Sequence, residues 1–142
     1  MDEIYSNYEK HALEHIQGFT ELVGLKLESI EPGHIIIYFD VREELTNPRG
    51  IVHGGAIFTL MDTAAGMAGV YTPHGERSLV TQCSTIHFLR MVDHGKVRAE
   101  SRLIKEGKNV SLSRVDVYDE NGKLAATGDF ELFYVNEQGQ SK

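Results

Sequence analysis

The sequence predicts an α+β domain in which a curved antiparallel sheet wraps around one long central helix. Its 142 residues suit one domain, spanning residues 1–142, and leave little room for a second. The segment 55–71 is apolar and long enough for a helix, and four strand-like segments follow it at short intervals. Strands joined by short connections run antiparallel, because parallel strands need a longer crossover. These observations together predict one sheet around one helix.

The N-terminal part is expected to form a helix and then a hairpin. Within a lead-in segment, 1–24, apolar residues recur every four positions between 3 and 17, which favours an amphipathic helix. Two short segments rich in β-branched residues, 25–31 and 35–41, are then separated by a Pro-Gly turn. This pattern predicts a β-hairpin.

The central helix, 55–71, is the most informative stretch. It is apolar nearly all round, so we expect it to be buried on every side. Small residues in its second half would let another backbone or a ligand approach closely. These residues are Thr63, Ala64, Ala65, Gly66, Ala68 and Gly69.

The C-terminal half reads as four strands with turn signals between them. The strand-like segments are 78–90, 96–106, 109–119 and 123–135. The breaks are Asp93-His94-Gly95, Glu106-Gly107-Lys108 and Asn121-Gly122. Each break predicts a hairpin, because glycine and asparagine accept positive φ. The polar tail 136–142 is expected to be frayed.

Net charge argues against a general nucleic-acid binder. The chain has 14 basic and 21 acidic residues, for a net charge of −7. One stretch, 90–114, is locally basic, with seven basic and three acidic residues. It could hold a small phosphorylated ligand. On the sequence alone, charges that solvate the outer face of strands explain it better.

The sequence is that expected of a cytoplasmic protein with no membrane partner. No apolar run approaches the roughly 20 residues needed to cross a bilayer, and the acidic N-terminus has no apolar signal segment. The single cysteine, Cys83, cannot form an intrachain disulfide, which fits a reducing compartment. Its position in a strand predicts core packing, not a nucleophile.

Several familiar chemical signatures are missing. The sequence has no glycine-rich nucleotide loop, no Gly-x-Ser-x-Gly elbow and no Cys-x-x-Cys pair. His11 and His15 have the spacing of one helix face, but no further ligand cluster accompanies them. We therefore expect no metal site.

Asp62 stands out as an ionisable group halfway along the most apolar helix. Burying an unpaired carboxylate costs free energy or raises its pKa. A carboxylate with a raised pKa in a dry cleft suits a general base or a nucleophile. Alternatively, Asp62 is structural, held by the hydroxyl of Thr59 or Thr63 or by an interface partner. Both interpretations stay open at this point.

A second candidate is His53-Gly54-Gly55, at the start of the same helix. Unpaired N–H groups at a helix start bind a carbonyl oxygen or an oxyanion, although two glycines also make a simple tight turn. Gly54 and Asp62 lie about 12 Å apart along the axis at ~1.5 Å per residue. One carbonyl therefore cannot touch both in one chain. If both are catalytic, two antiparallel helices in a dimer must share each site.

The motif Asn47-x5-His53-Gly54-Gly55-x6-Asp62 resembles that of hotdog-fold acyl-CoA thioesterases, specifically the PaaI-like, phenylacetate-degradation branch. The resemblance covers nearly the whole chain and includes the segments 81–90 and 121–128. It implies a hotdog fold. It also implies hydrolysis of an acyl-CoA thioester to a carboxylic acid and free CoA.

The resemblance implies a role for each matching position of the motif. Asp62 would be the general base or nucleophile that acts on the thioester. The Gly54 amide would polarise the thioester carbonyl. His53 would orient the motif or help to hold that carbonyl, and Asn47 would position the water or the carbonyl.

A hydroxyl early in the next strand often completes such sites, and Thr81 aligns best, with Ser84 as the alternative. Arg90 and Lys108 are the candidates for contacts with CoA phosphates. Gly55 would let the substrate approach the backbone. The acyl pocket would be lined from the central helix and its dimer mate by Phe58, Leu60, Met61 and Met67.

The resemblance implies no cofactor and no metal, since the CoA thioester is itself the substrate. The expected partners are acyl-CoA and a second copy of the chain, as a homodimer or a dimer of dimers. Two other functions remain as alternatives. One is a hotdog hydratase acting on enoyl or 3-hydroxyacyl thioesters, whose motifs are missing here. The other is a protein without catalysis, either an acyl-CoA-binding protein or a structural dimer.

Overall fold

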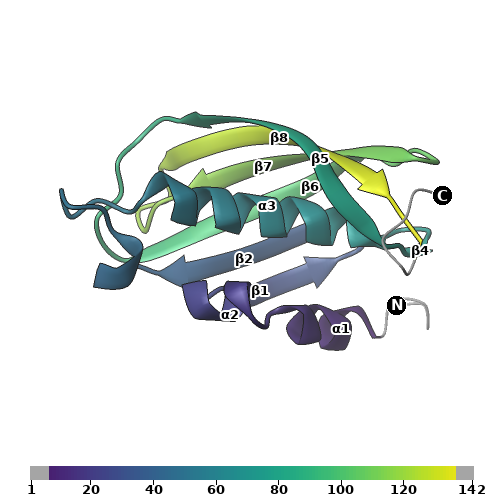
Figure 1. Cartoon of the computed structure of the whole chain (residues 1–142), viewed down its shortest axis with the longest axis horizontal. Helices are drawn as coiled ribbons and strands as arrows, with labels where there is room; N and C mark the ends of the chain where they lie inside the picture. Colours follow the sequence, from purple (N-terminus) through teal and green to yellow (C-terminus); the bar gives the residue numbers. More distant parts are fainter. Residues whose placement is uncertain (1–6, 137–142) are drawn as a thin grey trace.

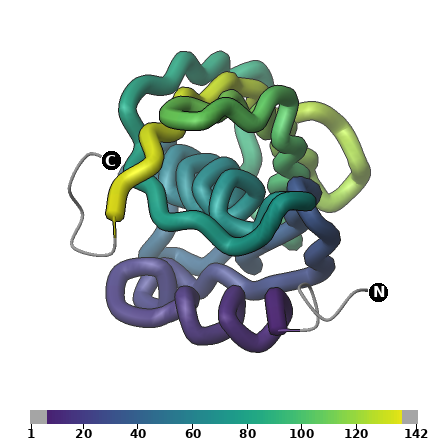
Figure 2. The backbone as a smooth tube through the Cα atoms, turned by 90° about the vertical axis from the view of Figure 1, so that its right-hand side faces the viewer, coloured from purple at the N-terminus to yellow at the C-terminus, as the bar shows by residue number. Residues whose placement is uncertain are grey.

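The computed structural model describes residues 7–136 and shows an antiparallel sheet curved around one long helix (Figure 1). The helix, α3 (Gly54–Val70), lies in the concave face of the sheet, and Figure 2 views it nearly end-on. Six strands form the sheet in the order β1-β2-β6-β7-β8-β5. Their bounds are β1 (Lys26–Glu31), β2 (His34–Asp40), β5 (Leu79–Phe88), β6 (Lys96–Lys105), β7 (Val110–Tyr118) and β8 (Leu124–Tyr134). The predicted α+β class is confirmed.

The shorter elements lie around this framework. They are α1 (Tyr8–His15), α2 (Phe19–Val23), the 3-10 turn η2 (Glu43–Leu45), and the hairpin of β3 (Tyr71–Thr72) and β4 (Gly75–Glu76). The predicted lead-in helix is confirmed as α1, whereas α2 was not predicted. Both helices lie beside β1 (Figure 1). The first residues of the lead-in segment and the tail from 137 onward are outside the described residues.

Three of the four predicted hairpins are confirmed by strand pairing. β1 pairs with β2, β6 with β7, and β7 with β8, all antiparallel. In β2, alternation directs Ile35, Ile37 and Phe39 into the core, where they are fully buried. The sheet therefore closes one side of α3 with a continuous apolar layer.

The hairpin predicted at Asp93-His94-Gly95 is wrong. β5 pairs with β8 at the edge of the sheet, while both edges of β6 are taken by β2 and β7. The connection between β5 and β6 instead passes the start of α3, where the Val52 N–H donates to the Val92 carbonyl at 2.8 Å. Gly95 therefore lies in a loop between two strands that do not pair with each other, and not in a hairpin turn.

One face of α3 is exposed, so the expectation of burial on every side is wrong for the single chain. The buried face packs on the sheet through residues such as Leu60 and Ala64, whereas Phe58 is 40% exposed and Asp62 is half-buried. Beside that face lies β5, a sheet-edge strand exposed along most of its length. Cys83, expected in the core, is exposed there, next to a register shift in the pairing with β8.

The outer face of the sheet explains most of the basic stretch at 90–114. Lys96 and Arg98 both pair with Glu28, at 3.1 and 2.6 Å. The hydrogen bond from Arg98 is the main cause that lowers the pKa of the Glu28 carboxyl. Arg102 and Arg114 likewise have carboxylate partners. These charges solvate the sheet and are not available to a ligand.

Two buried serines beneath α3 give a stability prediction. Within residues 7–136, the Ser101 hydroxyl has no hydrogen-bond partner, whereas Ser113 donates to the Ala65 carbonyl at 3.1 Å. Ser101→Ala removes an unsatisfied buried hydroxyl and is expected to stabilise the fold by about 1 kcal/mol. Ser113→Ala removes a made bond and is expected to destabilise it by about 1 kcal/mol. Urea denaturation of both variants checks this, and a loss of stability in Ser101→Ala would contradict it.

No helix within residues 7–136 is long and apolar enough to cross a membrane.

Candidate active site

The start of α3 carries one unsatisfied backbone donor. His53 is the N-cap, and its Nδ1 accepts from the Gly55 N–H at 2.7 Å. Its carbonyl accepts from Ala56 and Ile57, at 2.9 and 3.3 Å. Among the described residues, nothing accepts from the Gly54 N–H. Gly54 therefore offers a single free donor at the positive end of the helix dipole.

The two glycines of the motif do different things. A Cβ at position 55 would lie 2.9 Å from the His53 Nδ1, so Gly55 makes room for the capping imidazole. A Cβ at position 54 would lie 3.6 Å from the ring of Phe88, an ordinary contact. Packing therefore does not demand glycine at position 54. The bare backbone there leaves the N–H open to a ligand.

Asn47 organises the loop that faces Gly54. Its Oδ1 accepts from the N–H groups of Arg49 and Ile51, at 2.9 and 3.2 Å, which fixes a tight turn. The turn needs Gly50, whose φ is +78°. The side-chain NH2 of Asn47 has no partner within the described part of the chain. It remains free to donate to a bound carbonyl or water.

Asp62 and Thr81 come together as the resemblance implied. The hydroxyl of Thr81, on β5, donates to Oδ1 of Asp62, on α3, at 2.6 Å. The Thr59 hydroxyl donates instead to the Gly55 carbonyl, at 2.8 Å, so Thr59 does not hold Asp62. The carboxylate thus has one oxygen fixed by a hydroxyl, on the exposed face of α3.

A groove of about 640 Å³ lies at the start of α3 and contains Gly54. Its lining residues are Asn47, Arg49, Ile51, Val52, Gly54, Ile57, Phe88, Leu89, Arg90, Met91, Val92 and Ala125. Asn47, Gly54 and Arg90 were expected from the sequence, whereas Arg49 and Phe88, which come from distant segments, were not. Asp62 is not part of the lining. In one chain the groove and the Asp62–Thr81 pair are therefore separate half-sites.

The other predicted residues are placed away from these half-sites or at their border. Phe58 is on the exposed face of α3, with its ring 6.1 Å from that of Phe130. Met61 is fully buried in the core, as is Leu60, and Met67 is nearly so.

Lys108 lies at the opposite end of α3 from Arg90. Arg77 connects the Lys108 turn to the end of the helix, because it donates to the Lys108 carbonyl at 2.6 Å and its own N–H bonds to Val70. The structure therefore does not bring Lys108 and Arg90 together in one chain.

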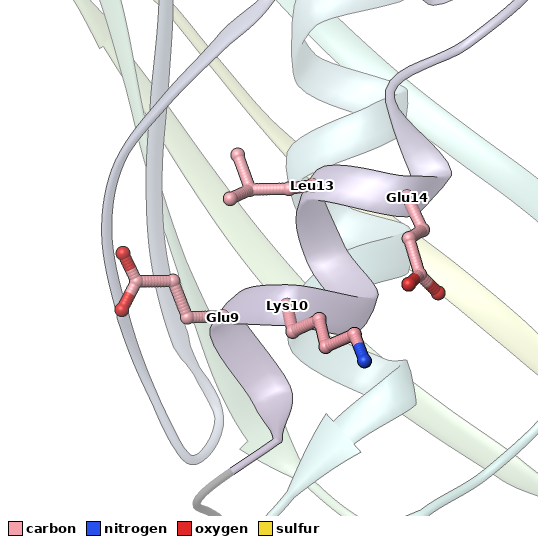
Figure 3. Close-up of a pocket in the computed structure, with 4 residues that line it drawn as sticks. All are labelled: Glu9, Lys10, Leu13 and Glu14. Carbon is pink, nitrogen blue, oxygen red and sulfur yellow. The ribbon is translucent and has the colours of Figure 1, made fainter.

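A further hollow, of about 500 Å³, lies beside α1 and is lined by Glu9, Lys10, Leu13 and Glu14 (Figure 3). All four come from one helix, with Glu9 and Leu13 extending to one side and Lys10 and Glu14 to the other. No polar groups converge there. The nearby His11 and His15 have separate partners, Glu76 and Tyr71.

Comparisons with known proteins point to one family. The profile of the Thioesterase superfamily matches residues 49–126, which include Gly54, Asp62 and Thr81 but not Asn47. The proofreading thioesterase EntH of Klebsiella pneumoniae is 32% identical, over 74% of this chain and 77% of that protein. Two solved structures are similar at 27% identity. One is smu.793 from Streptococcus mutans bound to acetyl CoA (TM-score 0.76; 89% of this chain, 96% of that one). The other is a variant of the phenylacetic acid degradation protein PaaI from Thermus thermophilus (TM-score 0.75; 82% and 98%).

The family match covers more than half of the chain, and the resemblance to PaaI-like proteins is confirmed. The six-stranded antiparallel sheet around α3 is the hotdog fold. This chain belongs to the thioesterase superfamily and is a thioester hydrolase.

Proposed function

We propose that the protein hydrolyses acyl-CoA to a carboxylic acid and free CoA at sites shared by two copies of the chain. The observation that carries this proposal is the pair of half-sites on one helix: a Gly54 N–H with no partner among the described residues at its start, and a Thr81-bound Asp62 at its middle. The similar structure with bound acetyl CoA supports an acyl-CoA ligand.

The Gly54 N–H donates to the thioester carbonyl oxygen, where negative charge develops as the tetrahedral intermediate forms. A preorganised donor at a helix N-terminus stabilises that charge. Asn47 places its NH2 in the same groove, where it holds the carbonyl or the water. His53 keeps the first turn in shape through its bond to Gly55.

Asp62 supplies the second group. Thr81 fixes Oδ1, which leaves Oδ2 to accept a proton from water while the water oxygen attacks the carbonyl carbon. Collapse of the intermediate breaks the C–S bond, and the electron pair leaves with the CoA thiolate. A direct attack by Oδ2 uses the same Gly54 donor and gives an anhydride that water then opens.

A second copy is needed because Gly54 and Asp62 lie about 12 Å apart along one helix. The surface that would receive it is present. Among the strands of residues 7–136, none pairs with the outer edge of β5, and Val80 and Phe88 on this strand are 50% and 57% exposed. Antiparallel packing of two α3 helices beside two paired β5 strands brings Gly54 of one copy to Asp62 of the other.

Thiol release from a panel of acyl-CoAs tests the proposed function. The panel covers short, medium, long and aryl acyl groups, and free CoA is followed with a thiol reagent. We expect turnover of at least one class by a protein that is dimeric or larger in light scattering. If the folded protein releases no thiol from any member, the proposal fails. With an enoyl-CoA as a further substrate, loss of its absorbance without thiol release would show hydratase activity instead.

Thr81→Val is expected to lower kcat by roughly 10-fold or more, because a hydrogen bond to a charged group contributes about 1.5–3 kcal/mol. Valine keeps the shape of threonine but cannot donate to Asp62. Thr81→Ser restores the donor and should recover most of the activity. Thr85→Val, on the same strand, is the matched control. Steady-state thiol release measures all three, and a fully active Thr81→Val would show that the hydroxyl does not orient Asp62.

A further inference from the structure

β5 contains one extra residue close to the candidate site. The first part of the strand pairs with β8 in a register that places Thr81 opposite Leu132. From Cys83 onward the register is shifted by one, with Cys83 opposite Glu131. Gln82 is therefore an extra residue between the two registers. One extra residue on one strand of an antiparallel pair is a β-bulge, and bulges near active sites change where a side chain points.

The bulge decides which side chain of β5 faces Asp62. Residues that lie opposite each other on antiparallel strands point to the same face of the sheet. Leu132 is fully buried beneath α3, so its partner Thr81 points to this face, where its hydroxyl reaches Asp62. In a strand without the bulge, the later register would continue and Gln82 would lie opposite Leu132. Asp62 would then face an amide, and Thr81 would point to the outer face of the sheet.

The backbone and the apolar pattern do not favour the bulged register. A regular strand forms an uninterrupted ladder of hydrogen bonds, whereas a bulge disrupts it locally. Each register also directs one apolar side chain to α3. The bulged register directs Leu79 there, and the regular one would direct Val80. Side-chain contacts that exist only in the bulged register must therefore select it.

Leu79 makes such a contact with the bare backbone of α3. A Cβ at Gly69 would lie 2.7 Å from Cδ2 of Leu79, and a Cβ at Gly66 would lie 3.8 Å from its Cδ1. The leucine thus occupies the space that Gly69 leaves open. Valine is one methylene group shorter and would fill this space less well. In the observed register Val80 is instead 50% exposed.

We infer, on the basis of the proposed function, that Leu79 is a positioning residue for thioester hydrolysis. Its packing on Gly69 fixes β5 in the bulged register, which directs the Thr81 hydroxyl and not the Gln82 amide to Asp62. The small side of α3 at Gly69 therefore receives a side chain of the same chain. The sequence alone left open a ligand or another backbone at this place.

Moving the leucine by one position tests the assignment. In Leu79→Ser/Val80→Leu, the leucine packs on α3 only in the regular register, which directs Gln82 to Asp62. We expect kcat for acyl-CoA to fall roughly tenfold or more, as for Thr81→Val. Adding Gln82→Thr to this variant returns a hydroxyl to Asp62 and should restore most of the activity. Gln82→Thr in the wild-type sequence is the matched control and should leave kcat unchanged.

Deletion of Gln82 separates register from packing. Without the extra residue, regular pairing directs both Leu79 and Thr81 to α3, so the deletion variant should stay active. Leu79→Ala should lower stability with or without Gln82, as measured by urea denaturation. It should lower kcat only in the chain that contains Gln82, because only that chain has a second register. Equal losses of kcat in both chains would show that Leu79 acts through packing alone, and the inference would be wrong.

The outcomes separate this inference from the proposed function. A wild type that releases no thiol sinks the proposed function, and stability then reports the register. Urea denaturation of Thr81→Val, Asp62→Ala and the double variant should show coupling between the two positions. In Leu79→Ser/Val80→Leu/Gln82→Thr, the coupling to Asp62 should pass to position 82. Coupling that stays with Thr81, or full activity in Leu79→Ser/Val80→Leu, would overturn the inference. If that variant does not fold, Leu79→Ala with and without Gln82 decides.

Discussion

Asp62→Asn is expected to lower kcat for acyl-CoA hydrolysis by about 10²–10⁴-fold, the usual contribution of a general base. Asparagine nearly preserves the volume, and its Oδ1 can still accept from the Thr81 hydroxyl, which lies 2.6 Å from Asp62 Oδ1. It cannot take a proton from water or attack as a carboxylate. Thiol release under saturating acyl-CoA measures the loss, and light scattering should show an unchanged oligomer.

The chain contains a matched control for this variant. On the outer face of the sheet, the Thr127 hydroxyl donates to Asp116 Oδ1 at 2.7 Å, which is the same threonine–aspartate pair away from either half-site. Asp116→Asn should leave kcat unchanged. If Asp62→Asn loses its folded circular dichroism or its oligomer along with activity, the carboxylate is structural. Folding retained with full activity would remove Asp62 from the reaction.

The chemistry on α3 could be predicted from the sequence because it is local. A carboxylate in an apolar helix and an amide at that helix's start are visible in a single segment, and their spacing requires a second copy if both are catalytic. The Asp62–Thr81 contact was not local. It joins residues 19 apart on different elements and was expected only from the resemblance to a family.

The sequence does not show which strands that are distant in the chain pair in the sheet. The Asp93-His94-Gly95 signal looks like any hairpin, because a turn motif carries no information on which strand edges are already occupied. The apolar pattern of α3 predicted burial on every side, but such a pattern does not tell whether the same chain or a second copy covers each face. Arg49 likewise joins Arg90 in one groove only because the fold brings together segments that are distant in the sequence.

Gly54→Pro is expected to lower kcat by about 10²–10³-fold, the cost of removing one oxyanion donor. Proline is well tolerated at the first helical position, where the N–H has no partner within the helix. The preceding residue, His53, has φ −62° and ψ 136°, a conformation that proline allows before it. Gly54→Ala keeps the N–H, and its Cβ would meet only Phe88, at 3.6 Å. The alanine variant should therefore keep far more activity, measured by thiol release. Equal losses in both variants would point to bulk, not the donor.

Mixing the two inactive variants then tests whether two chains share each site. If Gly54 of one copy works with Asp62 of the other, a mixed dimer of Gly54→Pro and Asp62→Asn has one intact site and one doubly altered site. Random exchange from equal amounts makes about half of the dimers mixed, so the mixture should recover about one quarter of the wild-type rate. Sites contained within single chains give no recovery, because every chain then carries one defect. A quarter of the activity from two inactive proteins would establish the shared site without any structure of the dimer.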